Sequence, residues 1–94
     1  YYRILINLSR NNLTQFDFEY LYLFQNLADL DLSFNLIKNV SPVKKIIKNE
    51  IRYLNLKSNL IKLIPEKFFD YFSELIFLDL SENKIFEFSS NSFK

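Results

Sequence analysis

Glycine, histidine and cysteine, on which many catalytic and binding sites depend, are all missing from this chain of 94 residues. Without glycine, the chain cannot form the glycine-rich loops that hold phosphate groups. Without histidine it has no Ser-His or Cys-His catalytic pair and no histidine pH switch, and without cysteine it has no thiolate ligand for zinc. We therefore predict that the chain is not an enzyme and holds neither a metal ion nor a cofactor.

An excess of one charge and a long apolar run are also lacking. The formal net charge is +1, which gives no electrostatic basis for binding nucleic acid. No run of 18 apolar residues occurs, and the residues from Tyr1 onward do not resemble a signal peptide. Any attachment to a membrane would require a span outside this segment, and oligomeric state is not evident from the sequence.

What the chain does contain is one pattern that recurs every 24 residues. Residues 75–88 follow the frame L-x-x-L-x-L-x-x-N-x-I-x-x-F, and the same frame starts again at Arg3, Leu27 and Ile51. Repeat positions 1, 4, 6, 11 and 14 are apolar in nineteen of twenty cases, with Arg3 as the exception, although only 49% of the chain is hydrophobic. The pattern predicts one domain, residues 1–94, with four repeats whose strand units start near residues 3, 27, 51 and 75.

Repeat position 9 holds an asparagine in all four units. The side-chain amide offers two donors and one acceptor, and buried backbone groups at a turn must be paired. We expect these asparagines to bond the backbone of their own and the neighbouring unit as a structural ladder, and replacement of the internal Asn59 by alanine to cost about 1–3 kcal/mol. The asparagine ladder consists of Asn11, Asn35, Asn59 and Asn83.

Repeat positions 3 to 7 alternate between polar and apolar residues, which predicts a short strand with positions 4 and 6 inward and 3, 5 and 7 outward. The segment between strands is predicted to form one or two helical turns, because Phe69, Phe72 and Leu75 lie three apart after Pro65. In the first connection Leu21 and Phe24 take the same places. In the second, residues 41–48, lysines interrupt the pattern and predict a less regular turn.

These units resemble the 24-residue leucine-rich repeats of extracellular animal proteins, such as Toll-like receptors and related adhesion proteins. The resemblance rests on repeat length, on asparagine at position 9 and on phenylalanine in the connecting segment, and it covers nearly the whole chain. It implies an α/β solenoid, a curved horseshoe with a parallel sheet on the concave face and irregular or short helical turns on the convex face. Neither end has a recognisable cap, so we expect an excerpt of a longer array.

Outward positions of the strands form the expected ligand-binding face. Exposed aromatic residues on a sheet are typical anchors of an interface, although an aromatic at position 3 could equally cover its neighbour. Arg10 and Lys57 would lie beside Asp29 and Asp31 as a solvated mixture of charges. The candidate binding residues are Tyr53, Phe77, Phe34, Lys57, Asp31, Asn55, Asp79 and Arg10.

Two loop asparagines, Asn12 and Asn39, stand in N-x-S/T sequences and are candidate glycosylation sites. A third sequence of this kind begins at Asn7, but a glycan there would block the sheet face. A basic run including Lys44 precedes several acidic residues later in the chain. This order of charge fits either a solvated surface or a head-to-tail contact between basic and acidic ends.

The leading hypothesis is a recognition module that binds a protein ligand, as part of a signalling receptor or a secreted glycoprotein, at the cell surface or outside the cell. One alternative is a structural spacer that only holds other segments at a fixed distance. Another is a cytoplasmic adaptor or scaffold, for which Asn12 and Asn39 would carry no glycan.

Overall fold

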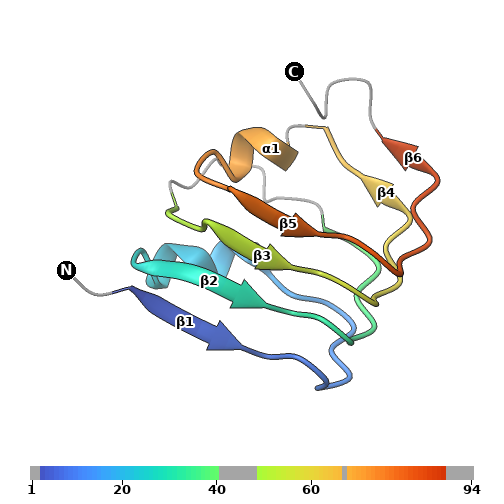
Figure 1. Cartoon of the computed structure of the whole chain (residues 1–94), viewed down its shortest axis with the longest axis horizontal. Coiled ribbons are helices and arrows are strands. Elements are labelled where there is room, and N and C mark those ends of the chain that lie inside the picture. The colour runs from blue at the N-terminus through green and yellow to red at the C-terminus, as the bar shows by residue number, and fades with distance from the viewer. Residues whose placement is uncertain (1–2, 41–48, 67, 89–94) are drawn as a thin grey trace.

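A four-stranded parallel sheet dominates the computed structural model of the chain, which describes residues 3–40, 49–66 and 68–88. Its strands lie in chain order, β1-β2-β3-β5 (Figure 1). Neighbouring strands pair residues that are one repeat apart, so that Asp29 lies beside Tyr53 and Tyr53 beside Phe77. The strands are β1 (Ile4–Asn7), β2 (Leu27–Asp31), β3 (Tyr53–Asn55) and β5 (Phe77–Asp79).

A second, smaller sheet pairs β4 (Leu63–Ile64) with β6 (Glu87–Phe88), also in parallel. The sequence analysis did not predict these strands. Ile64 and Phe88 occupy repeat position 14 and lie side by side in the register, so this sheet also joins residues one repeat apart. Two-residue strands are too short for an alternating pattern to reveal them.

Two short helical segments lie in the first and third connections: the 3-10 helix η1 (Phe18–Leu23) and the α-helix α1 (Phe68–Tyr71). The expected core residue Phe69 is only half-buried, whereas Phe68 is fully buried. The reason is that the helical turn begins at Phe68, whose amide donates to the Pro65 carbonyl over 3.3 Å. A turn that starts there directs Phe68, Tyr71 and Phe72, at spacings of three and four, towards the sheet.

In the first connection the predicted core residue Phe24 is also wrong, because its side chain is 42% exposed. Phe18 and Leu21 are buried instead, at the three-residue spacing of one helical turn. The predicted irregular turn at residues 41–48 lies outside the described residues.

Apolar side chains from the sheet and the connections meet in one continuous core. In the second and third units, positions 1, 4, 6 and 11 are almost completely inaccessible to water, as for Leu30 and Leu54. The equivalent residues of the first and last units, such as Ile6 and Leu78, are only partly buried. The middle units therefore provide the centre of the core, and the outer two units form its edges.

The strands end two residues earlier than predicted, at position 5 rather than position 7. The cause is local: the Asp31 Oδ1 accepts the Ser33 amide over 2.9 Å, and the same bond forms from Ser81 to Asp79. A side chain that takes this amide replaces a bond of the sheet ladder with a turn. The prediction that positions 3, 5 and 7 all point into solvent is also wrong at Ser33, which is buried.

The residue that follows this turn has left-handed backbone geometry in every unit. The φ angles at position 8 are 59° at Arg10, 55° at Phe34, 56° at Ser58 and 57° at Glu82. In a chain without glycine, these four residues each carry the steric cost of about 1–2 kcal/mol that a Cβ brings to this region. The hydrogen bonds of the adjacent turn hold the backbone there and direct the chain out of the sheet.

Candidate binding face

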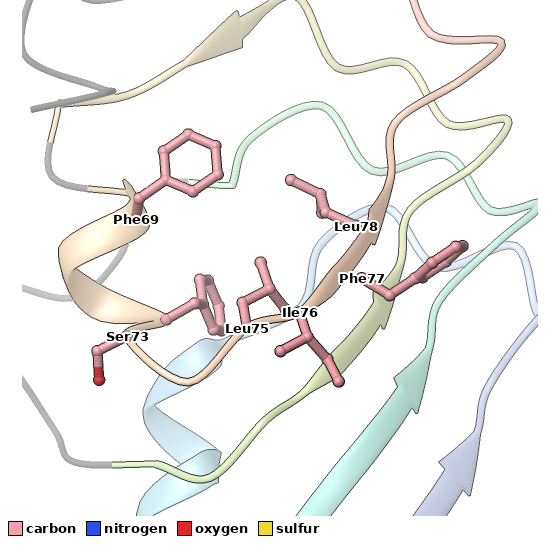
Figure 2. Close-up of a pocket in the computed structure, with 7 residues that line it drawn as sticks. Phe69, Ser73, Leu75, Ile76, Phe77 and Leu78 are labelled. Carbon is pink, nitrogen blue, oxygen red and sulfur yellow. The ribbon is translucent and has the colours of Figure 1, made fainter.

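Tyr53 and Phe77 form a stacked aromatic pair at position 3 of neighbouring strands. Their ring centroids are 4.4 Å apart and the planes differ by 6°. Phe77 remains 43% exposed, and Figure 2 shows it pointing away from the side of β5 that Leu78 faces. Tyr53 is half-buried, so each ring covers the other while one surface of the pair stays accessible to a partner.

Phe34 forms a second exposed aromatic site, flanked by two cations. The Arg10 guanidinium carbon lies 4.1 Å from the ring centroid and the Lys57 Nζ 5.9 Å from it. Lys57 also forms an ion pair of 3.8 Å with Glu82. The predicted grouping of these cations with Asp29 and Asp31 is therefore replaced by contacts with Phe34 and Glu82. Cation–π contacts at exposed sites contribute about 0.5–1 kcal/mol, so they orient the ring and leave 38% of it exposed.

The position 5 candidates turn one side-chain oxygen towards their own backbone. Asn55 accepts the Lys57 amide over 3.0 Å, just as Asp31 and Asp79 accept those of Ser33 and Ser81. The Ser81 hydroxyl and amide lower the pKa of Asp79, assisted by the positive charge of Lys57 and opposed by partial burial. These side chains thus fix the ends of the strands beneath the aromatic residues.

The asparagines of position 9 make the same set of bonds in successive units. The Asn59 Nδ2 donates to the carbonyls of Leu32 and Leu56, over 3.0 and 3.1 Å, and its Oδ1 accepts the Ile37 amide over 3.0 Å. Asn35 and Asn83 bond the preceding unit in the same way. Asn11, in the first described unit, bonds only carbonyls of its own unit.

Asn49 and Tyr71 are structural residues that the sequence analysis missed. The Tyr71 hydroxyl donates to the Phe18 carbonyl over 2.9 Å inside the core, and so joins the first and third connections. The buried Asn49 donates to the Tyr71 carbonyl over 2.8 Å and accepts the Ile51 amide over 3.2 Å. Asn49 has glutamine and serine at the equivalent positions of neighbouring units, so the repeat gives no signal for it.

A hollow of about 370 Å³ opens between α1 and β5. In Figure 2, Phe69 from α1 and Leu78 from β5 point towards one another across it. Ser73 is its one polar side chain, so it offers no charged or metal-binding group to a ligand. Among the residues that the structure describes, no group of three or more acidic side chains is placed to hold a metal ion.

Both candidate glycosylation asparagines are exposed, and Asn12 has a left-handed φ of 55°. The residue Ser41, which completes the sequence at Asn39, lies outside the described residues. The side chain of Asn7 accepts bonds from the amide and hydroxyl of Ser9. That arrangement matches the other position 5 residues and engages the oxygen of the amide group.

Comparison of the chain with protein-family models, with curated proteins and with solved structures found no match. Within residues 3–40, 49–66 and 68–88, no helix has the length and apolar character needed to cross a membrane. Any functional proposal must therefore be carried by the residues and contacts described above.

Proposed function

We propose that the chain is a leucine-rich repeat recognition module and that it binds a protein partner through the outward face of its four-stranded sheet. The observation that carries the proposal is the set of aromatic side chains left accessible on this face: the stacked pair of Tyr53 and Phe77, and Phe34 with its flanking cations. Aromatic and arginine side chains provide most of the binding energy at protein interfaces.

The geometry supports binding because these side chains are already held in place. Phe77 is stacked against Tyr53, and Phe34 against the Arg10 guanidinium, so little side-chain entropy is lost when a partner docks. Repeated backbone turns, fixed by the side chains at position 5, set the spacing of these groups. A rigid aromatic surface flanked by Arg10 and Lys57 suits a partner that offers apolar and acidic groups.

The test is a triple variant that removes the aromatic rings: Phe34→Asn, Tyr53→Thr and Phe77→Thr. Asparagine tolerates the left-handed backbone at Phe34, and threonine suits a strand. The wild type and the variant are compared as bait for proteins of the source cell, and each captured protein is then titrated. The proposal expects the affinity of a genuine partner to fall by about 30-fold or more, the loss of about 2 kcal/mol that defines a hot spot.

The matched control replaces three exposed leucines outside the sheet face, Leu23, Leu36 and Leu63, with serine. Their side chains are 66%, 42% and 43% exposed, so this control changes a similar amount of apolar surface. If both triple variants remain folded and lose binding equally, the effect is general stickiness. A partner that binds the aromatic variant as tightly as the wild type contradicts the proposed face.

A structural spacer is the second candidate, and one observation favours it: Tyr53 and Phe77 satisfy much of their apolar surface by stacking on each other. A spacer tolerates the aromatic triple variant but not the deletion of one 24-residue unit. Location at the cell surface or outside the cell remains part of the proposal. Glycans on Asn12 or Asn39 of the native protein, detected by mass spectrometry, would support that location over the cytoplasmic alternative.

A further inference from the structure

The two edges of the main sheet carry complementary rows of backbone groups. Between neighbouring units, the Leu32 amide donates to the Asn55 carbonyl over 2.8 Å and the Phe34 amide to the Lys57 carbonyl over 2.9 Å. At the last strand, the equivalent amides of Leu80 and Glu82 have no acceptor among the described residues. At the first strand, the row of carbonyls that would receive such bonds faces outward, because β1 is an edge strand.

The asparagine ladder ends with the same complementarity. Inside the structure, the Asn35 Oδ1 accepts the amides of Asn11 and Leu13 from the preceding unit. The Ile85 amide, at the position of Leu13, has no such acceptor within the described part of the chain, and the Asn11 Oδ1 accepts no amide there. An additional unit placed against β5 with its own asparagine would satisfy both.

Charge also matches across these edges. Side chains at position 8 of neighbouring units are in contact: the Ser58 hydroxyl donates to Glu82 over 2.6 Å, and Arg10 lies on the Phe34 ring. The first edge ends in Arg10 and the last edge in Glu82. A second copy that continues the register therefore places its Arg10 against Glu82, an opposite-charge pair at this column.

Apolar surface is exposed on both edges and would be covered by the same contact. Ile76 is 77% exposed and Phe77 43% exposed on the last edge, and Leu5 is 71% exposed on the first. Continuing the register places Leu5 of the next copy beside Phe77, just as Phe77 lies beside Tyr53. It also places Ile6 next to Leu78, at the mouth of the hollow between α1 and β5.

We infer that the chain associates head to tail with a second copy of itself, with β5 of one copy pairing in parallel with β1 of the next. The hydrogen-bond rows, the ladder ends and the pair of Arg10 with Glu82 all require the same register. A contact of this kind joins two different surfaces, so each added copy presents a fresh edge and association can continue. The inference does not depend on the proposed protein-binding function.

Reversal of charge tests the register. In sedimentation equilibrium of the 94-residue chain, Arg10→Glu and Glu82→Arg should each weaken association by about tenfold, because like charges then meet. The double variant carries the pair in reversed order and should restore association. Thermal unfolding of each variant shows whether it is folded. A folded double variant no stronger than the single variants, or a wild type that stays monomeric at all concentrations, overturns the inference.

Disulfide trapping then fixes the orientation, and the absence of native cysteine makes the chain suitable for it. Neighbouring parallel strands are about 4.8 Å apart, within the Cα separation of a disulfide. A mixture of the Leu5→Cys and Phe77→Cys chains should form a mixed dimer under a thiol–disulfide buffer, while a Leu23→Cys control paired with Phe77→Cys should not. Preferential linkage of two Leu5→Cys chains, or of two Phe77→Cys chains, would exclude head-to-tail pairing.

Discussion

Replacement of Asn59 by alanine is the perturbation that the structure evaluates most closely. The Asn59 side chain is 4% exposed and forms bonds in two units at once. Two of the carbonyls it bonds keep another donor, because Asn35 also donates to the Leu32 carbonyl and Asn83 to that of Leu56. The Ile37 amide, by contrast, loses the Asn59 Oδ1 as its acceptor inside the core.

The magnitude follows from this difference. Carbonyls that retain one bond cost little, whereas a buried amide without a partner costs about 1–3 kcal/mol. We expect the free energy of unfolding to fall by about 2–3 kcal/mol, a large part of the 5–15 kcal/mol typical of a small domain. Urea denaturation followed by circular dichroism, or by the fluorescence of the six tyrosines, measures it directly.

Asn11→Ala is the matched control, since it makes the same chemical change in the same turn of the first unit. Asn11 is exposed and accepts no amide from another unit within the described residues. Its replacement should cost about 0.5 kcal/mol or less. If Asn11→Ala and Asn59→Ala destabilise the chain equally, the orphaned Ile37 amide is not the cause and the reasoning fails.

Further predictions concern the core and the titration of one carboxylate. Tyr71→Phe removes the buried bond to the Phe18 carbonyl and should lower the free energy of unfolding by about 1–2 kcal/mol, while Tyr53→Phe should change it little; equal effects in urea denaturation would contradict this role. Ser81→Ala removes the groove's main hydroxyl donor to Asp79, so the pKa of Asp79 should rise towards 3.8 in an NMR titration, and an unchanged pKa would refute that cause. Because folding lowers this pKa, the stabilisation by Asp79 is complete above pH 3.8 and is lost as the pH falls through the folded value. Wild type should therefore lose more stability below pH 3.8 than Asp79→Asn does, as acid denaturation can measure.

The repeat made the strands predictable because it fixes which residues alternate at a constant interval. The strand pairs Asp29–Tyr53 and Tyr53–Phe77 follow that interval directly. Strand ends were not predictable from alternation, since they depend on whether the residue at position 5 bonds the backbone at position 7. Apolar periodicity alone cannot register this competition between a side chain and the sheet ladder.

The connections were harder to predict because their packing is not repeated. Phe68 and Phe69 are adjacent and chemically identical, and only the start of α1 decides which of them enters the core. The bond from Tyr71 to Phe18 joins residues 53 positions apart, a separation that no multiple of 24 gives. Contacts between unrelated positions of this kind depend on three-dimensional packing.

At the candidate binding face, the sequence indicated the correct residue types but not their neighbours. Phe34, Tyr53 and Phe77 could be selected because aromatic side chains at outward positions stand out against the polar background. Arg10 was expected near carboxylates, but the left-handed backbone at position 8 places it over the Phe34 ring. The direction of a side chain after a turn depends on backbone dihedral angles that repeat spacing does not specify.

The most direct test of the account is amide hydrogen exchange at position 11, measured by NMR at low protein concentration. The account holds that each unit is fastened to the next by an asparagine that accepts this amide, as at Ile37 and Ile61. We predict that both amides exchange far more slowly than that of Ile85, which has no such acceptor among the described residues. Exchange at Ile37 and Ile61 as fast as at Ile85 would contradict the stacking of units through the asparagine ladder.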